Sequence, residues 1–299
     1  MRPNAIVMPI LFVAFWSTGF ISARYAMPYA EPFGFLTVRY ILSTLALAAI
    51  AAAFRAPRLS WVHIRDSMIA GILLHAVYLD MVFWAIDHGM PAGLSALIVG
   101  LQPIITAFLA AATLGETITP RHWLGLAVGL VGVTMVLLPR IGVIGSGVNV
   151  WTVGASFIAV LGMSAGTVWQ KARLKGANLM ATTSWQFIGA GLVTLPLAIF
   201  AEKHEVTITT PLVLSMIWLV LVLSVGTILL LMWLIEQGAV SRVAALFYLV
   251  PACTALFAFI LFDEPLSLVQ IVGMAVTAVA VAMTAGAGSS RPPVAPGSA

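Results

Sequence analysis

The chain has 299 residues, of which 62% are hydrophobic and only 8% are charged, with a formal net charge of +4. A soluble domain carries about 25% charged residues, so this composition excludes a soluble globular protein and predicts an integral membrane protein. The positive charge does not indicate nucleic-acid binding, because the basic residues lie at the ends of apolar runs rather than in one patch.

Ten apolar runs follow one another along the chain, separated by charges, prolines and glycines. Each has about 18–23 residues, enough for an α-helix to cross about 30 Å of hydrocarbon. The runs lack the two-residue alternation of barrel strands, so helices rather than a β-barrel are expected to satisfy the backbone in lipid. The predicted fold is an all-α integral membrane protein with ten transmembrane helices, at residues 5–26, 33–54, 67–87, 92–112, 121–138, 151–170, 179–200, 213–235, 240–262 and 267–286.

The stretch 84–116 recurs, loosely, as 233–264. Each copy begins with a tryptophan, reaches a glycine five residues later and carries a proline within its apolar run, Pro103 or Pro251. The two prolines are 148 positions apart, about half the chain length, which predicts two tandem homologous halves. The expected units are a first five-helix repeat at 1–146, a second, inverted repeat at 147–286 and a disordered cytoplasmic tail at 287–299.

The basic residues predict the orientation of the chain in the membrane. If the N-terminus is cytoplasmic, ten basic residues lie on the inner side and three on the outer side, so the positive-inside rule places both termini in the cytoplasm. An odd number of helices per half inverts the second half, and inverted repeats are typical of secondary transporters. The inner residues are Arg2, Arg55, Arg58, Arg65, Arg121, Lys171, Arg173, Lys175, Arg242 and Arg291, and the outer ones are Arg24, Arg140 and Lys203.

The repeated segments resemble the EamA-type repeats of the drug/metabolite transporter superfamily. The Leu-Gly-Glu ending at 114–116 and the Asp-Glu-Pro ending at 263–265 are the more specific marks of this resemblance. Within the superfamily, the overall pattern is most similar to bacterial YddG-type exporters of aromatic amino acids. The resemblance implies ten helices, cytoplasmic termini, a central cavity and export of amino acids or related metabolites across a bacterial inner membrane.

Polar and aromatic side chains within the predicted spans are candidates for a substrate site, because polar groups in the bilayer are costly. His75 and Tyr78 are three residues apart and, on an α-helix, share a face, whereas Asp80 lies about 140° from His75. Trp16 on the first helix and Trp169 on the equivalent sixth helix stand beside small hydroxyl residues that suit the wall of a pocket. We expect Trp16, His75, Tyr78, Trp169 and Tyr248 to bind substrate; a buried histidine satisfied by a carbonyl and ordinary core packing of the rings are the alternatives.

Asp80 is the one carboxylate well inside a predicted span, and Arg39 lies at a matching depth on the antiparallel second helix. An unpaired charge there costs several kcal/mol, so we expect Arg39 and Asp80 to form a structural ion pair. The alternatives are that Arg39 binds a substrate carboxylate or that Asp80 carries a coupling proton.

Pro103 and Pro251 remove backbone donors in the middle of the fourth and ninth predicted helices. The carbonyls of Val99 and Phe247 then lack their helical partner. Both prolines are therefore hinge or ligand-facing candidates, with a plain kink as the equal alternative. Gly162 and Gly166 have the four-residue spacing that lets helices approach closely, and we interpret them as packing within the bundle.

The sequence predicts a secondary transporter that exports amino acids, aromatic or otherwise bulky and apolar, and related metabolites by alternating access. No Walker A, Gly-x-Ser-x-Gly or His-Glu-x-x-His motif is present, so an enzyme is not expected. No cofactor or metal is expected either, and the single Cys253 excludes a multi-cysteine site. The expected partners are a small-molecule substrate and the lipid bilayer, not nucleic acid, and a monomer is sufficient, with an oligomer as the alternative. A lipid-modifying enzyme using His75 and Asp80, or a passive solute channel, are the alternative functions.

Overall fold

The computed structural model describes residues 4–115, 118–137, 145–227, 229–230, 250–263 and 267–285. Each of the ten predicted runs contains helix, and across the described part the one strand-like pairing is an isolated bridge between Ala30 and Val206. The α-helices are α1 (Asn4–Ala26), α2 (Pro32–Ala53), α3 (Trp61–Gly71), α4 (Met81–Asp87), α5 (Ala92–Val99), α6 (Gln102–Leu114), α7 (Pro120–Leu137), α8 (Val150–Arg173), α9 (Leu179–Ala201), α10 (Thr210–Ile217), α13 (Val250–Phe262) and α14 (Leu268–Ala285). The π-helices are η1 (Ile72–Asp80) and η3 (Trp218–Gly226).

Five helical segments of the described chain are long and apolar enough to cross a membrane. They are Pro32–Ala53, Trp61–Asp87, Ala92–Leu114, Val150–Arg173 and Leu179–Ala201. Shorter apolar helices at Ile10–Ala26, Thr210–Gly226, Val250–Phe262 and Leu268–Ala280 accompany them. The all-helical membrane fold predicted from composition is therefore confirmed. The predicted tail, 287–299, lies outside the described residues.

The helix starts follow from local capping. Ser60 accepts a hydrogen bond from the backbone N–H of His63 at the start of α3, and Asn149 forms a capping box with Thr152 at the start of α8. Asn178 and Thr209 cap α9 and α10 in the same way. These short polar residues satisfy backbone donors that the first turn of a helix leaves unpaired.

The third predicted helix differs from the prediction in both length and geometry. It begins at Trp61 rather than at residue 67, and its middle nine residues form the π-helix η1 between α3 and α4. A second π-helix of nine residues, η3, occupies the eighth predicted helix. A π-helix closes its hydrogen bonds from residue i to i+5 and turns less per residue than an α-helix, so residues five apart lie closer to one face than they do in an α-helix. The face assignment for His75, Tyr78 and Asp80, which assumed an α-helix, therefore does not hold.

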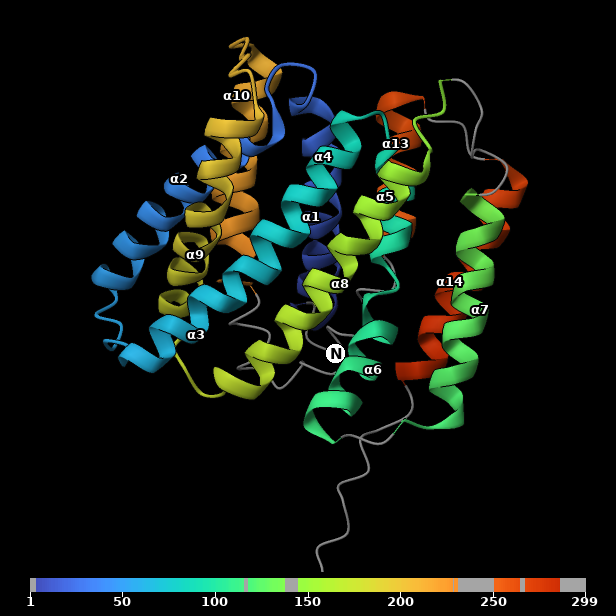
Figure 1. The fold of residues 1–299 in the computed structure, drawn as a ribbon, viewed down its shortest axis with the longest axis horizontal. Helices are drawn as coiled ribbons and strands as arrows, with labels where there is room; N and C mark the ends of the chain where they lie inside the picture. The colour runs from blue at the N-terminus through green and yellow to red at the C-terminus, as the bar shows by residue number, and fades with distance from the viewer. Residues whose placement is uncertain are drawn as a thin grey trace, which may run out of the picture.

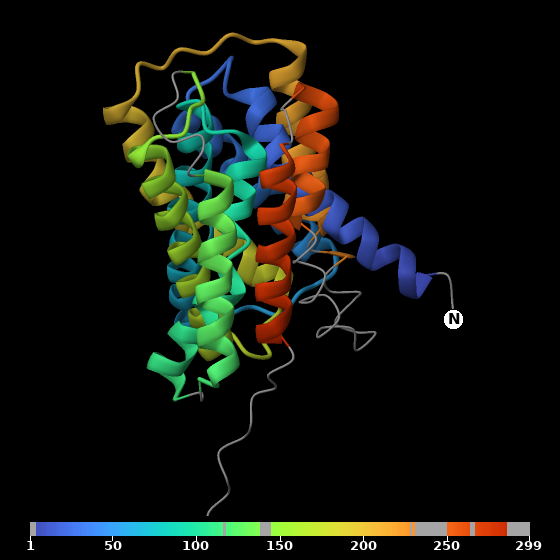
Figure 2. The same cartoon turned by 90° about the vertical axis from the view of Figure 1, so that its right-hand side faces the viewer.

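Helices from opposite ends of the chain pack in pairs. Figures 1 and 2 show α7 beside α14, and Figure 1 shows α2 beside α9; α5 packs on α13, and α8 packs along α3, η1 and α4. Gly162 and Gly166 of α8 lie against Val77 and Leu74 of η1 so closely that an added Cβ would clash. This confirms that these glycines serve close packing within the bundle.

Close backbone contact also brings α9 against the third predicted helix. A Cβ on Gly71 would overlap the backbone of Gln186, and a Cβ on Gly189 would overlap the carbonyl of Met68. These two glycines let α9 lie directly on α3 and η1. The side chains of α9 next to them therefore reach the π-helix.

At the upper end in Figure 1, two carboxylates join α2 to α9 by reciprocal hydrogen bonds to backbone N–H groups. Glu202, after α9, accepts from Phe33 at 2.6 Å and from Gly34 at 2.7 Å, at the start of α2. Glu31, before α2, accepts from Lys203 and Glu205, both at 3.0 Å. Glu31 makes no side-chain cap on its own helix, so α2 is capped from the other half of the chain. We call this arrangement the carboxylate clasp.

The pKa values of the two acids of the clasp are shifted in opposite directions. Burial raises the pKa of Glu202 above its ordinary value, and the carboxylates of Glu31 and Asp87 act in the same direction, against its two backbone donors. Burial also acts to raise the pKa of Glu31, but the backbone donors at Lys203 and Glu205 outweigh it and hold that pKa below its ordinary value. The environment of the clasp therefore favours the charged form of Glu31 and disfavours the charged form of Glu202.

The substitution Glu202→Ala is expected to lower the free energy of unfolding, because it leaves the N–H groups of Phe33 and Gly34 without acceptors. Loss of an N-cap costs about 0.5–2 kcal/mol. Denaturation of the purified protein in detergent measures the change. Glu205→Ala is the control, since this acid is exposed in the same loop and takes part only through its backbone. Equal destabilisation by both substitutions would contradict a capping role for Glu202.

Candidate functional site

A buried carboxylate, Asp80, joins three helices inside the bundle. Asp80 is 1% exposed. One of its carboxylate oxygens accepts a hydrogen bond from the Tyr40 hydroxyl on α2 at 3.1 Å, and the other accepts one from the Thr194 hydroxyl on α9 at 2.7 Å. The Tyr40 hydroxyl lies equally close, 3.1 Å, to the carbonyl oxygen of His75. Both carboxylate oxygens thus have hydroxyl donors, as a buried charge requires.

The π-helix places His75 on the same side as Asp80, five residues along. The imidazole of His75 stacks on Phe187 of α9, with ring centroids 4.5 Å apart, and Phe187 in turn stacks on Tyr40, with centroids 5.9 Å apart. Nε2 of His75 is buried and has no hydrogen-bond partner. Gln186 lies close enough to the imidazole to interact with it. An aromatic wall with an unused ring nitrogen therefore lies one turn of the π-helix from Asp80.

Arg39 does not form the predicted ion pair with Asp80. In the part of the chain that the structure describes, no salt bridge involves Arg39, and its Nε has no hydrogen-bond partner. Asp80 is instead occupied by Tyr40 and Thr194. Depth in the span was estimated from residue counts, but the angular position depends on the π-helix, which residue counts do not reveal.

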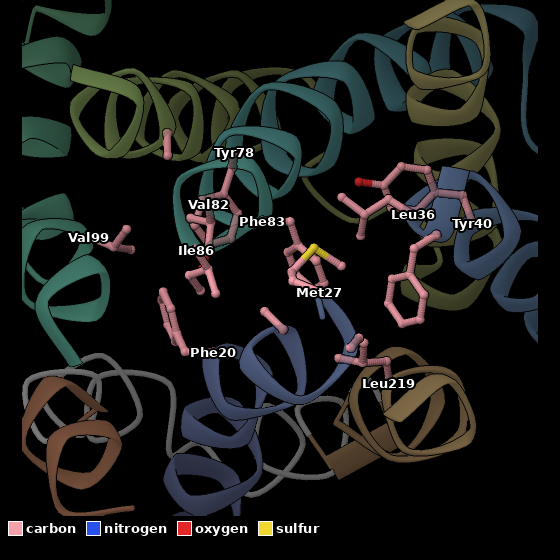
Figure 3. Packing of buried hydrophobic residues seen from close by; sticks show 14 of the residues in the cluster. Phe20, Met27, Leu36, Tyr40, Tyr78, Val82, Phe83, Ile86, Val99 and Leu219 are labelled. Atoms are coloured by element: carbon pink, nitrogen blue, oxygen red, sulfur yellow. The ribbon is translucent and has the colours of Figure 1, made fainter. Parts of the chain in front are cut away.

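Trp16 and Tyr78 lie in or against the main hydrophobic cluster, which also contains Tyr40 and Phe187 of the stack on His75. Tyr78 is buried in the main apolar cluster, and Trp16 packs against the same cluster with its ring 5.8 Å from that of Phe12. Figure 3 shows Tyr78 beside Val82 in this cluster, which draws side chains from α1, α2, η1, α4, α5, α8, α9, α10, η3 and α13. Both rings still line the interior between the two halves of the chain.

Trp169 lies near the C-terminal end of α8 (Val150–Arg173). Its indole N–H donates to the carbonyl of Asp66 at 3.2 Å, and the Arg173 guanidinium lies 5.4 Å from its ring centroid. A weak link to the His75 face runs through Gln170, the next residue, which accepts from Gln186 at 3.4 Å. Trp169 is therefore positioned at one end of the interior, and Tyr248 lies outside the described residues.

The fourth predicted helix is broken close to Pro103. α5 ends at Val99, and α6 begins at Gln102 with Pro103 in its first turn. The break at Gly100 lies directly against the ring of Pro251, so that an added Cβ would be 2.7 Å from its Cγ. Gly100 therefore lets α13, through Pro251, approach the break closely.

The structure brings several further polar residues of α6 and α8 together. The side-chain amide of Gln102 donates to the hydroxyls of Thr106 at 3.1 Å and Thr167 at 3.3 Å. The backbone carbonyl of Gln102 accepts from the hydroxyl of Ser164 on α8 at 3.2 Å. Thr194 and Gln186 of α9 carried no signal beyond being polar residues in a span. Across the described residues, no group of three or more His, Cys, Asp or Glu side chains gathers as a metal site would require.

Residues 3–138 and 150–286 each match the EamA-like transporter family. The chain belongs to this family. The EamA-type resemblance of the repeats is thereby confirmed, and the EamA-like protein is a multi-pass membrane transporter of small molecules rather than an enzyme.

Three relatives illustrate the range of the family. A WAT1-related chloroplastic protein of Arabidopsis thaliana is 24% identical over 89% of this chain and 66% of its own length. Protein PecM of Dickeya dadantii is 25% identical over 69% of the chain and 68% of its own length. A probable amino-acid metabolite efflux pump of Escherichia coli is 23% identical over 89% of the chain and 90% of its own length. This EamA-like chain thus spans just under two thirds of the Arabidopsis relative.

A solved structure superposes with a TM-score of 0.65, covering 95% of this chain and 96% of its own, at 17% identity. Likeness at this level of identity shows the fold alone. It agrees with the helical architecture of the EamA-like chain.

The substitution Thr194→Val is expected to lower the free energy of unfolding by about 1–3 kcal/mol, because it leaves one oxygen of a buried carboxylate unpaired. Valine keeps the shape of threonine, so packing changes little. Chemical denaturation in detergent measures the loss, with Thr113→Val as the control on an exposed helix position. A loss for Thr194→Val no larger than that for the control would contradict a structural role for this hydrogen bond.

Proposed function

We propose that this EamA-like protein is a secondary transporter that exports amino acids, aromatic or otherwise bulky and apolar, and related metabolites by alternating access. The observation that carries the proposal is the polar and aromatic face of η1, which meets α9 of the second half inside the bundle. A transporter needs a solute site that both halves of the chain can wall. The Asp80 and His75 contacts supply such a meeting point.

The pairing of helices supports two inverted five-helix halves. Taken in order, α1, α2, α3 to α4, α5 to α6 and α7 correspond to α8, α9, α10 to η3, α13 and α14. α2 packs on α9, α5 on α13 and α7 on α14, which are the pairs of corresponding helices. The remaining contacts also come in matched sets, since α1 packs on α10 as α8 packs on α3. Corresponding π-helices in the third and eighth helices, and the two separate family matches, support the same relation.

The chemistry of the interior supports an amino-acid or related substrate. The rings of His75, Phe187 and Tyr40 stack in sequence, and Trp16 and Tyr78 line the adjoining core. Such surfaces suit an apolar or aromatic side chain. Two relatives, one of Escherichia coli and one of Salmonella typhimurium, carry the name probable amino-acid metabolite efflux pump. Pro251 lies against Gly100 at the break between α5 and α6, and Pro103 is in the first turn of α6; this break is the proposed hinge.

The distribution of basic residues supports a bacterial inner-membrane location with both termini in the cytoplasm. The end that carries the clasp holds Arg24 and Lys203. At the opposite end lie the connections and helix ends that contain Arg55, Arg58, Arg65, Arg121, Lys171, Arg173 and Lys175. By the positive-inside rule, the second group faces the cytoplasm.

Cysteine labelling in cells tests this orientation. Cysteines introduced at Arg58 and Lys175 are expected to react only from the cytoplasmic side, and a cysteine at Lys203 only from outside, because these positions lie at opposite ends of the spans. Cys253, which is half-buried in α13, is replaced by alanine beforehand. Labelling of Arg58 and Lys203 positions from the same side would refute the proposed arrangement.

Transport by the purified chain in sealed liposomes tests the function. Uptake of labelled phenylalanine is expected to saturate and to accelerate when unlabelled phenylalanine is present on the far side, because a carrier exchanges solute at one site. A passive channel would give uptake that rises linearly and shows no exchange. A lipid-modifying enzyme would move no phenylalanine at all.

Within the same assay, Phe187→Leu is expected to weaken phenylalanine transport by about 2- to 12-fold relative to leucine transport, the equivalent of about 0.5–1.5 kcal/mol of ring stacking. Phe200→Leu is the matched control, since Phe200 lies on the same helix with 86% of its surface exposed. Unchanged preference in the Phe187 variant would remove this face from the proposed site.

A further inference from the structure

Arg39 is a buried cation without a described counterion. The residue is 5% exposed, lies within the Pro32–Ala53 span, and its Nε has no hydrogen-bond partner. No ion pair of the described chain involves it. An uncompensated charge in a bilayer is costly and is found where it serves binding or transport. A guanidinium kept in this state therefore calls for an anion that the described residues do not supply.

The surroundings of Arg39 offer hydrogen-bond donors rather than a competing charge. Tyr40, Tyr78 and His75 are the groups close enough to interact with it electrostatically. Ser43, one turn along on the same face of α2, has a buried hydroxyl without a partner, and Nε2 of His75 is also unpartnered. A guanidinium with such neighbours matches the two oxygens of a carboxylate, which accept best from a charged, forked donor.

Asp80 is the counterion that the sequence predicts for Arg39, but both of its carboxylate oxygens accept hydrogen bonds from hydroxyl groups instead. Tyr40 and Thr194 each donate to one of its oxygens, and the second donor comes from α9, in the other half of the chain. The two hydroxyls therefore act as positioning groups that hold the carboxylate against α9. Arg39 is left available as a result.

We infer that Arg39 binds the carboxylate of the transported solute, so that the substrates are amino acids and apolar organic acids rather than amines. This inference rests on the proposed transport function and names the substrate chemistry of that site. The stacked rings of His75, Phe187 and Tyr40 lie beside the guanidinium's neighbours and suit the solute's apolar part. Carboxylate recognition and ring recognition thus come from adjacent groups on η1, α2 and α9.

The test compares solutes that differ in their charged group, using the full chain in liposomes of phosphatidylcholine alone, so that no anionic lipid supplies the counterion. Labelled phenylalanine uptake is measured in competition with 3-phenylpropionate, which keeps the carboxylate, and with phenylalaninamide and phenethylamine, which lack it. We expect 3-phenylpropionate to compete and the other two to be weaker by about tenfold or more, since hydrogen bonds to a charged group are the stronger ones. Equal competition by phenylalaninamide overturns the inference whatever the variants do.

Variants then assign the preference to Arg39. Arg39→Gln is expected to lose the discrimination between 3-phenylpropionate and phenethylamine, while Arg58→Gln, at an exposed position, keeps it. If Arg39→Gln does not fold, Arg39→Lys keeps the charge without the planar fork and is expected to retain a reduced preference. Full preference in a folded Arg39→Gln protein overturns the inference.

A binding measurement separates this inference from the transport proposal. Thermal unfolding of the purified protein is followed with 3-phenylpropionate and with phenethylamine, since a ligand that binds the folded state raises its stability. Stabilisation by 3-phenylpropionate that depends on Arg39, without any transport, would refute the transport function and keep the site. Transport of phenylalanine without such stabilisation would keep the function and refute the site.

Discussion

The Asp80 carboxylate, held between hydroxyls of α2 and α9, is the polar contact around which the interior is arranged. Inside hydrocarbon no water is available to satisfy a charge. The carboxylate must therefore keep its two hydroxyl donors within hydrogen-bonding distance. One donor belongs to the first half of the chain and the other to the second. A single side chain therefore ties the proposed halves together at the point where α9 crosses η1, and the glycines at 71 and 189 let the backbones come close enough for this to happen.

The π-helix determines which side chains share that point. In an α-helix His75 and Asp80 face different neighbours, but the wider turn of η1 brings residues five apart closer to one face. Both then face α9, where Phe187 meets the imidazole and Thr194 meets the carboxylate. The same turn leaves Nε2 of His75 and Nε of Arg39 unpartnered within a single region. Buried polar atoms without partners destabilise a fold, so the presence of two such nitrogens beside one aromatic stack supports the binding role proposed for this face.

The sequence predicted the helical runs closely because apolar length and local caps are properties of the sequence itself. The helix α9, for example, begins after Asn178 and ends within one residue of its predicted end. The family was identified from the resemblance of the repeated segments, whose more specific marks are the Leu-Gly-Glu and Asp-Glu-Pro endings. The site was predicted less well: His75 and Asp80 were found because ionisable residues are rare in spans, yet the predicted ion pair between Arg39 and Asp80 is not among the described salt bridges. The π-helix, which leaves no sequence mark, decides which of these side chains share a face. Tyr40 and Thr194 were missed because tyrosine and threonine are common in membrane helices, and only tertiary contact with Asp80 gives them a role.

The carboxylate clasp makes the two ends of the α2 and α9 pair unequal. At the clasp end, separating these helices breaks four hydrogen bonds between carboxylates and backbone N–H groups and also the Ala30–Val206 bridge. At the other end, α9 is capped by its own Asn178, and the described residues there include no such exchange between α2 and α9. Two halves related by an inverted repeat would be interchangeable if their ends were alike. The clasp makes the two ends different. In the proposed alternating access, α2 and α9 therefore stay joined at the clasp end, and Arg39 belongs to one of these two joined helices.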